Sequence, residues 1–98
     1  MTGTYILDGE EPKLVEDVLE WARWYEIADR YVAKTVLPNG TRVSTVFLGI
    51  DHSFTDGKPI LFETMIFGGR HDGYQERYAT WEEAEAGHKQ TLLIAREK

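Results

Sequence analysis

"RYVAKTVLPNGTRVSTVFLGI", residues 30–50, decides the fold of this 98-residue chain. Two runs rich in β-branched residues flank Pro38-Asn39-Gly40, and an Asn-Gly pair between such runs favours a two-residue type I′ hairpin turn. That turn would place Val36 opposite Val43. We therefore predict an antiparallel hairpin at the centre of the molecule.

The second strand of this hairpin and the segment after it are apolar on both faces. Val46, Phe47 and Leu48 are consecutive, and "PILFETMIFGG", residues 59–69, follows a polar loop. Strands that are apolar on both faces belong in the middle of a sheet. A short fourth strand, "ERYAT", residues 76–80, then completes a meander.

Two helices flank the meander. Apolar residues recur at helical spacing over residues 17–30, with Asp17 as the predicted N-cap. The last helix begins after Thr80, whose capping-box partner is Glu83. A turn signal at Asp8-Gly9 adds a possible short hairpin before the first helix.

The predicted fold class is α+β: a helix, a four-stranded antiparallel meander and a C-terminal helix, in a single domain over residues 1–98. We expect both helices on one face of the sheet. The second face then has no element of its own to cover it, so we expect a homodimer, or a higher homo-oligomer, that packs through this face.

The composition limits the partners. The chain has no cysteine, which excludes disulfides and thiolate metal sites and suits the cytoplasm. No apolar stretch is long enough to cross a membrane, and no secretory signal is recognisable at the N-terminus. A net charge of −6 argues against non-specific nucleic-acid binding but leaves room for a small anion held by a few arginines.

Asp51 and His52 end the second strand of the central hairpin. The pair could act as an acid and a base or bind a metal, because histidine titrates near neutral pH. The simpler interpretation is a turn in which the Asp51 side chain closes the strand. Adjacent strand residues point to opposite faces, so the two side chains do not easily share one ion.

His88 lies on the apolar stripe of the last helix, next to Gly87. It either reaches a site beside the sheet, or it is a half-buried histidine satisfied by a strand carbonyl or by Glu63. In the second case Gly87 would make room for Trp21 or Trp24.

Glu63 interrupts an apolar strand and needs a partner. Arg77 on the next strand is the natural one, and the alternative is that both residues line a ligand pocket on the open sheet face. Arg70 lies in the Gly-rich loop "GGRHDG", residues 68–73, where backbone N–H groups could bind an anion with arginine as a clamp.

Three strings of this sequence resemble a family of small proteins from bacteriophages and prophages: VSTVFLGxDHxF, ETMxFGG and RYxTxxEAxxGH. With the segment "WARWYEIADRYVAKT", residues 21–35, the resemblance extends over about residues 17–88. The resemblance implies a phage protein that works inside a bacterial host, and it implies no activity. It places Tyr78 among the candidate residues, together with Asp51, His52, Glu63, Arg77 and His88.

The sequence thus favours a non-catalytic binding protein, with no cofactor, no metal and no catalytic residue expected. Its ligand would be a small nucleotide-like anion, as in phage counter-defence, or a host protein. The predicted ligand-binding residues are Asp51, His52, Glu63, Arg70, Arg77, Tyr78 and His88. The alternatives are a small metal-assisted enzyme using Asp51, His52 and His88, and a structural or regulatory accessory protein.

Overall fold

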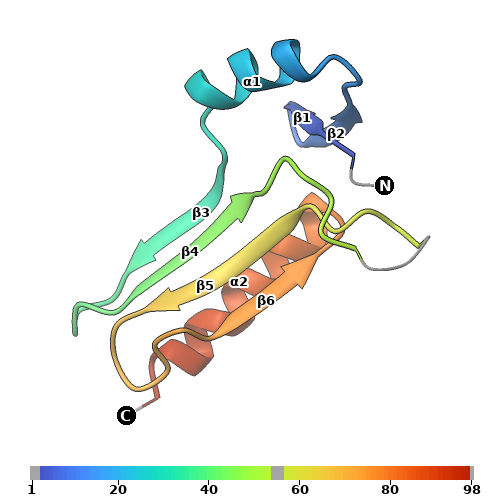
Figure 1. Cartoon of the computed structure of the whole chain (residues 1–98). Helices are drawn as coiled ribbons and strands as arrows, with labels where there is room; N and C mark the ends of the chain where they lie inside the picture. The colour runs from blue at the N-terminus through green and yellow to red at the C-terminus, as the bar shows by residue number, and fades with distance from the viewer. Residues whose placement is uncertain (1–2, 54–56, 98) are drawn as a thin grey trace.

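The computed structural model describes residues 3–53 and 57–97, and residues 54–56 of the predicted polar loop lie outside this part (Figure 1). An N-terminal hairpin precedes the first helix, a four-stranded sheet follows, and a second helix ends the chain. The elements are β1 (Tyr5–Asp8), β2 (Glu11–Leu14), α1 (Val18–Ile27), β3 (Tyr31–Val36), β4 (Arg42–Phe47), β5 (Phe62–Phe67), β6 (Gln75–Tyr78) and α2 (Trp81–Ala95).

The predicted α+β fold is confirmed. Strands β3, β4, β5 and β6 form an antiparallel meander in that order, and β1 pairs with β2 in a separate hairpin. Neither helix among the described residues is long and apolar enough to cross a membrane.

The central hairpin forms where it was predicted, but its turn is of another type. The Gly40 N–H donates to the Leu37 carbonyl at 2.9 Å, and only Gly40, with φ +87°, has a positive φ in the turn. A type I′ turn needs a positive φ at both central residues. Asn39 does not have a positive φ, so the turn is not of type I′. The turn is instead a type I turn followed by a glycine bulge, which pairs Val36 with Arg42 rather than with Val43.

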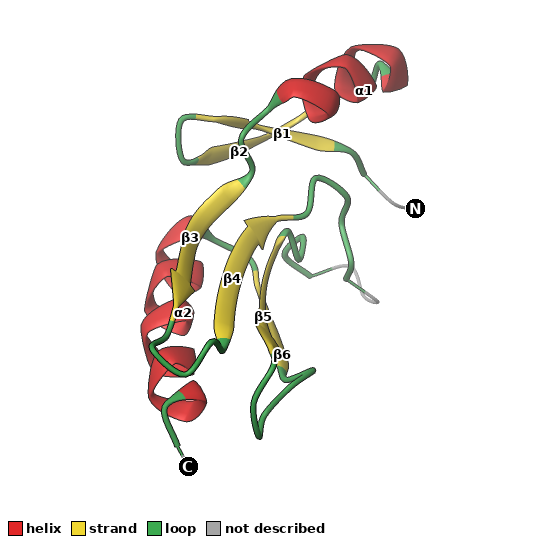
Figure 2. Cartoon of the chain, turned by 90° about the vertical axis from the view of Figure 1, so that its left-hand side faces the viewer, coloured by secondary structure: helices red, strands yellow, loops and turns green. Residues whose placement is uncertain are grey.

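Helix α2 covers one face of the sheet, as Figures 1 and 2 show. Buried side chains of β4 and β5 point toward it, and the predicted capping box of Thr80 and Glu83 fixes its first turn. The buried apolar residues of these three elements are Val43, Phe47, Phe62, Ile66, Ala84 and Ala95.

Helix α1 lies beyond the end of the sheet, so the expectation that both helices cover one face holds for α2 alone (Figure 2). It is shorter than predicted, because Ala28 is extended and the Asp29 carboxylate accepts the Tyr31 N–H at 3.0 Å. Trp21 donates its ring N–H to the Tyr5 carbonyl at 3.0 Å, and Trp24 meets the ring of Phe47 edge-on. The helix is therefore held by its tryptophans at the place where β1 meets the end of β4.

The face away from α2, called the open sheet face below, is mixed rather than purely apolar. Directly paired residues share a face, so three rows of side chains follow from the register. These rows are Val36–Arg42–Phe67, Lys34–Ser44–Met65–Gln75 and Tyr31–Val46–Glu63–Arg77.

Candidate functional site

A pocket of about 600 Å³ lies at the edge of the sheet, where β6 ends and α2 begins; we call it the rim pocket. It brings together three of the predicted residues, His52, Arg77 and Tyr78. Lys58 and Glu83 also line it. The volume lies within the range of pockets that hold small molecules, roughly 300–1,000 Å³.

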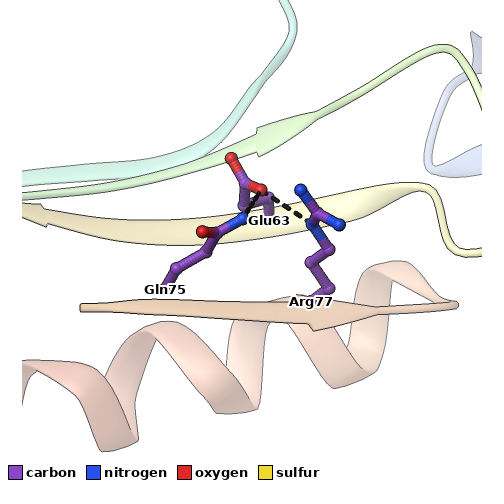
Figure 3. Close-up of polar contacts among 3 residues, drawn as sticks. All are labelled: Glu63, Gln75 and Arg77. Atoms are coloured by element: carbon purple, nitrogen blue, oxygen red, sulfur yellow. Dashed lines mark hydrogen bonds and ion pairs between the residues drawn. The ribbon is translucent and has the colours of Figure 1, made fainter. Parts of the chain in front are cut away.

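Arg77 is held in place by the neighbouring strand. Its Nε–H donates to Glu63 Oε2 at 2.9 Å, and the Gln75 side-chain amide donates to the same oxygen (Figure 3). The predicted cross-strand pair of Glu63 and Arg77 is therefore confirmed. Because the contact uses only Nε, the two terminal nitrogens of the guanidinium keep their donor capacity for a ligand.

Lys58 supplies a second positive charge. Within the described residues its ammonium group makes no ion pair. Among the described residues that line the pocket, the one carboxylate is that of Glu83, and it already accepts the backbone N–H groups of Ala79 and Thr80 at 3.1 Å. The pocket thus offers two cationic side chains, and the acidic residue of its described lining, Glu83, is engaged with the helix cap.

A second hollow, of about 320 Å³, lies between the N-terminal hairpin and the start of α2. Its lining includes Lys58 but also Glu10, Glu11 and Glu82. Three carboxylates repel an anion, so the rim pocket is the better anion site of the two.

The Asp51 side chain closes the end of the strand, so the simpler interpretation of Asp51, a strand-closing turn, is confirmed. Its Oδ1 accepts the N–H of Ser53 at 2.8 Å and that of Ile60 at 2.9 Å. Partial burial raises the pKa of the carboxyl, but these amide hydrogen bonds outweigh it, so the pKa lies below the usual value for aspartate. Asp51 therefore shapes the segment that carries His52 and Lys58 into the rim pocket.

His88 is enclosed between α2 and the sheet and is only 4% exposed. Its Nε2 lies 3.0 Å from Thr35 Oγ1 and its Nδ1 lies 2.7 Å from Thr45 Oγ1. Burial lowers the pKa of the imidazole, which favours the neutral ring. Threonine hydroxyls satisfy His88, rather than the strand carbonyl or the Glu63 carboxylate that we expected.

Gly87 makes room for Tyr78, and the expectation of Trp21 or Trp24 at this place is wrong. A Cβ atom at Gly87 would collide with the Tyr78 hydroxyl oxygen and the ring carbons beside it. That hydroxyl is buried and has no hydrogen-bond partner within the described chain. Tyr78 therefore joins the rim pocket to α2 mainly by packing.

Arg70 does not line the rim pocket. It belongs to the connection between β5 and β6, at the opposite end of these strands from Arg77. Asp51 and His52 also lie apart from His88, and no cluster of three or more potential metal ligands occurs in residues 3–53 and 57–97.

The sequence reasoning missed Lys58 in the rim pocket and the threonines around His88. Lys58 stands in a loop whose path a sequence does not reveal. The alternation of Thr45 and Thr64 with apolar residues was visible, and the short bond of 2.6 Å between their hydroxyls follows from their direct pairing.

No protein-family model, curated protein or solved structure matches this chain.

Proposed function

We propose that this chain is a non-catalytic binding protein that holds a small organic anion in the rim pocket. The observation that carries the proposal is the convergence of Arg77 and Lys58 on one pocket, with Arg77 oriented by Glu63. A guanidinium held at Nε presents its remaining N–H groups to a phosphate or carboxylate with little loss of rotamer freedom.

Binding fits this arrangement better than catalysis. A hydrolytic or transfer site needs a nucleophile beside a base, or a metal with several ligands. Here His52 lines the rim pocket, whereas His88 is enclosed between Thr35 and Thr45. The residues of the enzymatic alternative therefore do not face one ligand.

The proposed biological setting is phage counter-defence, supported by the resemblance of three sequence strings to phage proteins. The proposed ligand is a nucleotide-like host signal, whose phosphate would meet the cations. A host protein as partner is the second candidate, because the open sheet face exposes arginine and aromatic side chains, which interfaces favour.

Calorimetry and thermal-shift screening against cyclic nucleotides and ADP-ribose derivatives test the proposal. We expect at least one ligand to raise the melting temperature, and Arg77→Gln and Lys58→Gln to weaken its binding by about tenfold each, the effect of losing roughly 1.4 kcal/mol. Lys89→Gln is the matched control, since Lys89 is exposed on α2 outside the rim pocket. A protein that shows no shift with any of these anions at millimolar concentration would contradict the proposal.

A further inference from the structure

Helix α1 is poorly buried for an ordered helix. None of its residues, all of them described, is fully buried, and Leu19 and Ile27 are 69% and 86% exposed. Helical stability in proteins comes mostly from packing an apolar face, so a ten-residue helix with exposed aliphatic side chains indicates a missing contact surface.

The open sheet face presents the opposite charge to that of the chain as a whole. It carries Lys34, Arg42 and Arg77 but, of acidic residues in its three rows, only Glu63, on a chain of net charge −6. Val36 and Phe67 are 66% and 37% exposed at the end of this face far from α1. The Arg42 guanidinium lies 4.5 Å from the centre of the Phe67 ring.

The segment that contains α1 complements this surface. Residues 16–29 hold five carboxylates and one arginine. Its exposed Leu19 and Ile27 match the exposed Val36 and Phe67, and its negative charge matches Arg42 and Lys34. Opposite charges on facing surfaces set the orientation and the rate of association.

The chain is less compact than a typical monomer of its length. A folded monomer of 11.3 kDa typically exposes about 5,700 Å², whereas this chain exposes 6499 Å². The radius of gyration is 14.3 Å, against about 12.6 Å for a compact domain of this length.

The position of α1 shows how a second copy fits. In Figure 2 α2 lies on one side of the sheet, and α1 projects beyond the sheet end toward the other side. A copy turned by a two-fold axis, with its open face toward the first and its strands reversed, brings its own α1 over the row Val36–Arg42–Phe67.

We propose that the protein is a two-fold dimer in which the acidic α1 of each copy docks on the basic open sheet face of the other. Like charges oppose a simple pairing of two open faces, and the exchange of α1 removes that conflict. This specifies the homodimer expected from the sequence, and it does not depend on a ligand in the rim pocket.

Light scattering after size-exclusion chromatography and sedimentation velocity test the proposal. At about 100 µM, well above a micromolar Kd, the expected mass is twice the 11.3 kDa of one chain. Ile27→Lys, which removes an apolar contact and places a like charge against Lys34 and Arg42, and Arg42→Glu should each shift the protein to the monomer. Leu93→Lys is the matched control, because Leu93 is 59% exposed on α2 and far from both surfaces.

A charge exchange decides between this dimer and other assemblies. Arg42→Glu combined with Glu20→Lys and Glu26→Lys should restore the dimer, since the facing charges are then reversed together. Circular dichroism of every variant verifies that it is folded. A monomeric wild-type protein overturns the proposal, and so does a dimer that Arg42→Glu breaks but Ile27→Lys leaves intact, because α1 is then outside the interface.

Discussion

The Nδ1 atom of His88 lies 2.7 Å from the Oγ1 atom of Thr45, inside the contact between α2 and the sheet. The other ring nitrogen meets Thr35, and Thr45 in turn meets Thr64. This chain of hydroxyls and imidazole joins α2 to β3, β4 and β5. It satisfies a polar ring in a place where the surrounding residues are buried.

Replacement of His88 by leucine should destabilise the fold, although leucine suits a buried helical position. The substitution leaves the hydroxyl of Thr35 without its partner and removes one bond of Thr45. We expect a loss of about 1–3 kcal/mol in the free energy of unfolding, measured with urea. His52→Leu serves as the control, because His52 lies at the rim, and an unchanged stability of His88→Leu would contradict the network.

Acid should weaken the contact that His88 makes between α2 and the sheet. Burial lowers the pKa of His88 below its ordinary 6.5, so below that pH the unfolded chain binds a proton that the folded chain resists. The contribution of neutral His88 to stability is therefore fully present above pH 6.5. As the pH drops toward the lowered pKa, the free energy of unfolding falls by at most about 1.4 kcal/mol per pH unit for one proton.

Urea midpoints of the wild type and of His88→Gln measure this dependence. The variant should show a flatter profile over the first units below pH 6.5. The lowered pKa of Asp51 also removes stability in acid, but only near and below its ordinary value of 3.8, so the two effects separate in pH. If the urea midpoints of the two proteins change with pH by the same amount, His88 does not take up a proton on unfolding.

Gly87→Ala should destabilise the protein, against the usual order of helix propensity. In a helix interior this change normally stabilises by about 1 kcal/mol. Here the new Cβ would collide with the Tyr78 hydroxyl oxygen and ring carbons. We expect a cost of about 1–3 kcal/mol from overpacking.

A double-mutant cycle identifies the cause. In a Tyr78→Ala background Gly87→Ala should no longer be costly, because the ring that it meets is gone. Ala86→Gly, at the exposed neighbouring position, measures the effect of helix propensity on stability alone. Additive effects of the substitutions at positions 78 and 87 would contradict the close contact.

Much of the fold was predictable because it depends on local chemistry. The capping box of Thr80 and Glu83 involves residues three apart, and the pairing of Glu63 with Arg77 follows from strand alternation and the cost of an unpaired carboxylate. Asp51 likewise closes a turn. It accepts the N–H of Ser53, two residues further along the chain, and that of Ile60, which the strand pairing brings near.

The position of α1 was not predictable from periodicity. Its apolar residues specify a helix with a stripe of tryptophans, but not the surface that this stripe covers. Tyr5 and Phe47 receive Trp21 and Trp24, so the stripe faces the N-terminal hairpin and the end of β4. The side chains that line the rim pocket come from three separate segments of the chain, and no local sequence pattern connects these segments.

The turn of the central hairpin provides the last prediction. Gly40 alone carries a positive φ, +87°, while the Asn39 side chain accepts the Thr41 N–H at 2.9 Å. Gly40→Ala should therefore cost about 1 kcal/mol or more from backbone strain, and Asn39→Ala only the smaller loss of one partly buried hydrogen bond, without backbone strain. A type I′ turn would make both positions sensitive, because both would need a positive φ. Urea unfolding of the two variants distinguishes the turns, and an Asn39→Ala cost equal to that of Gly40→Ala would contradict the glycine bulge and the register that it sets.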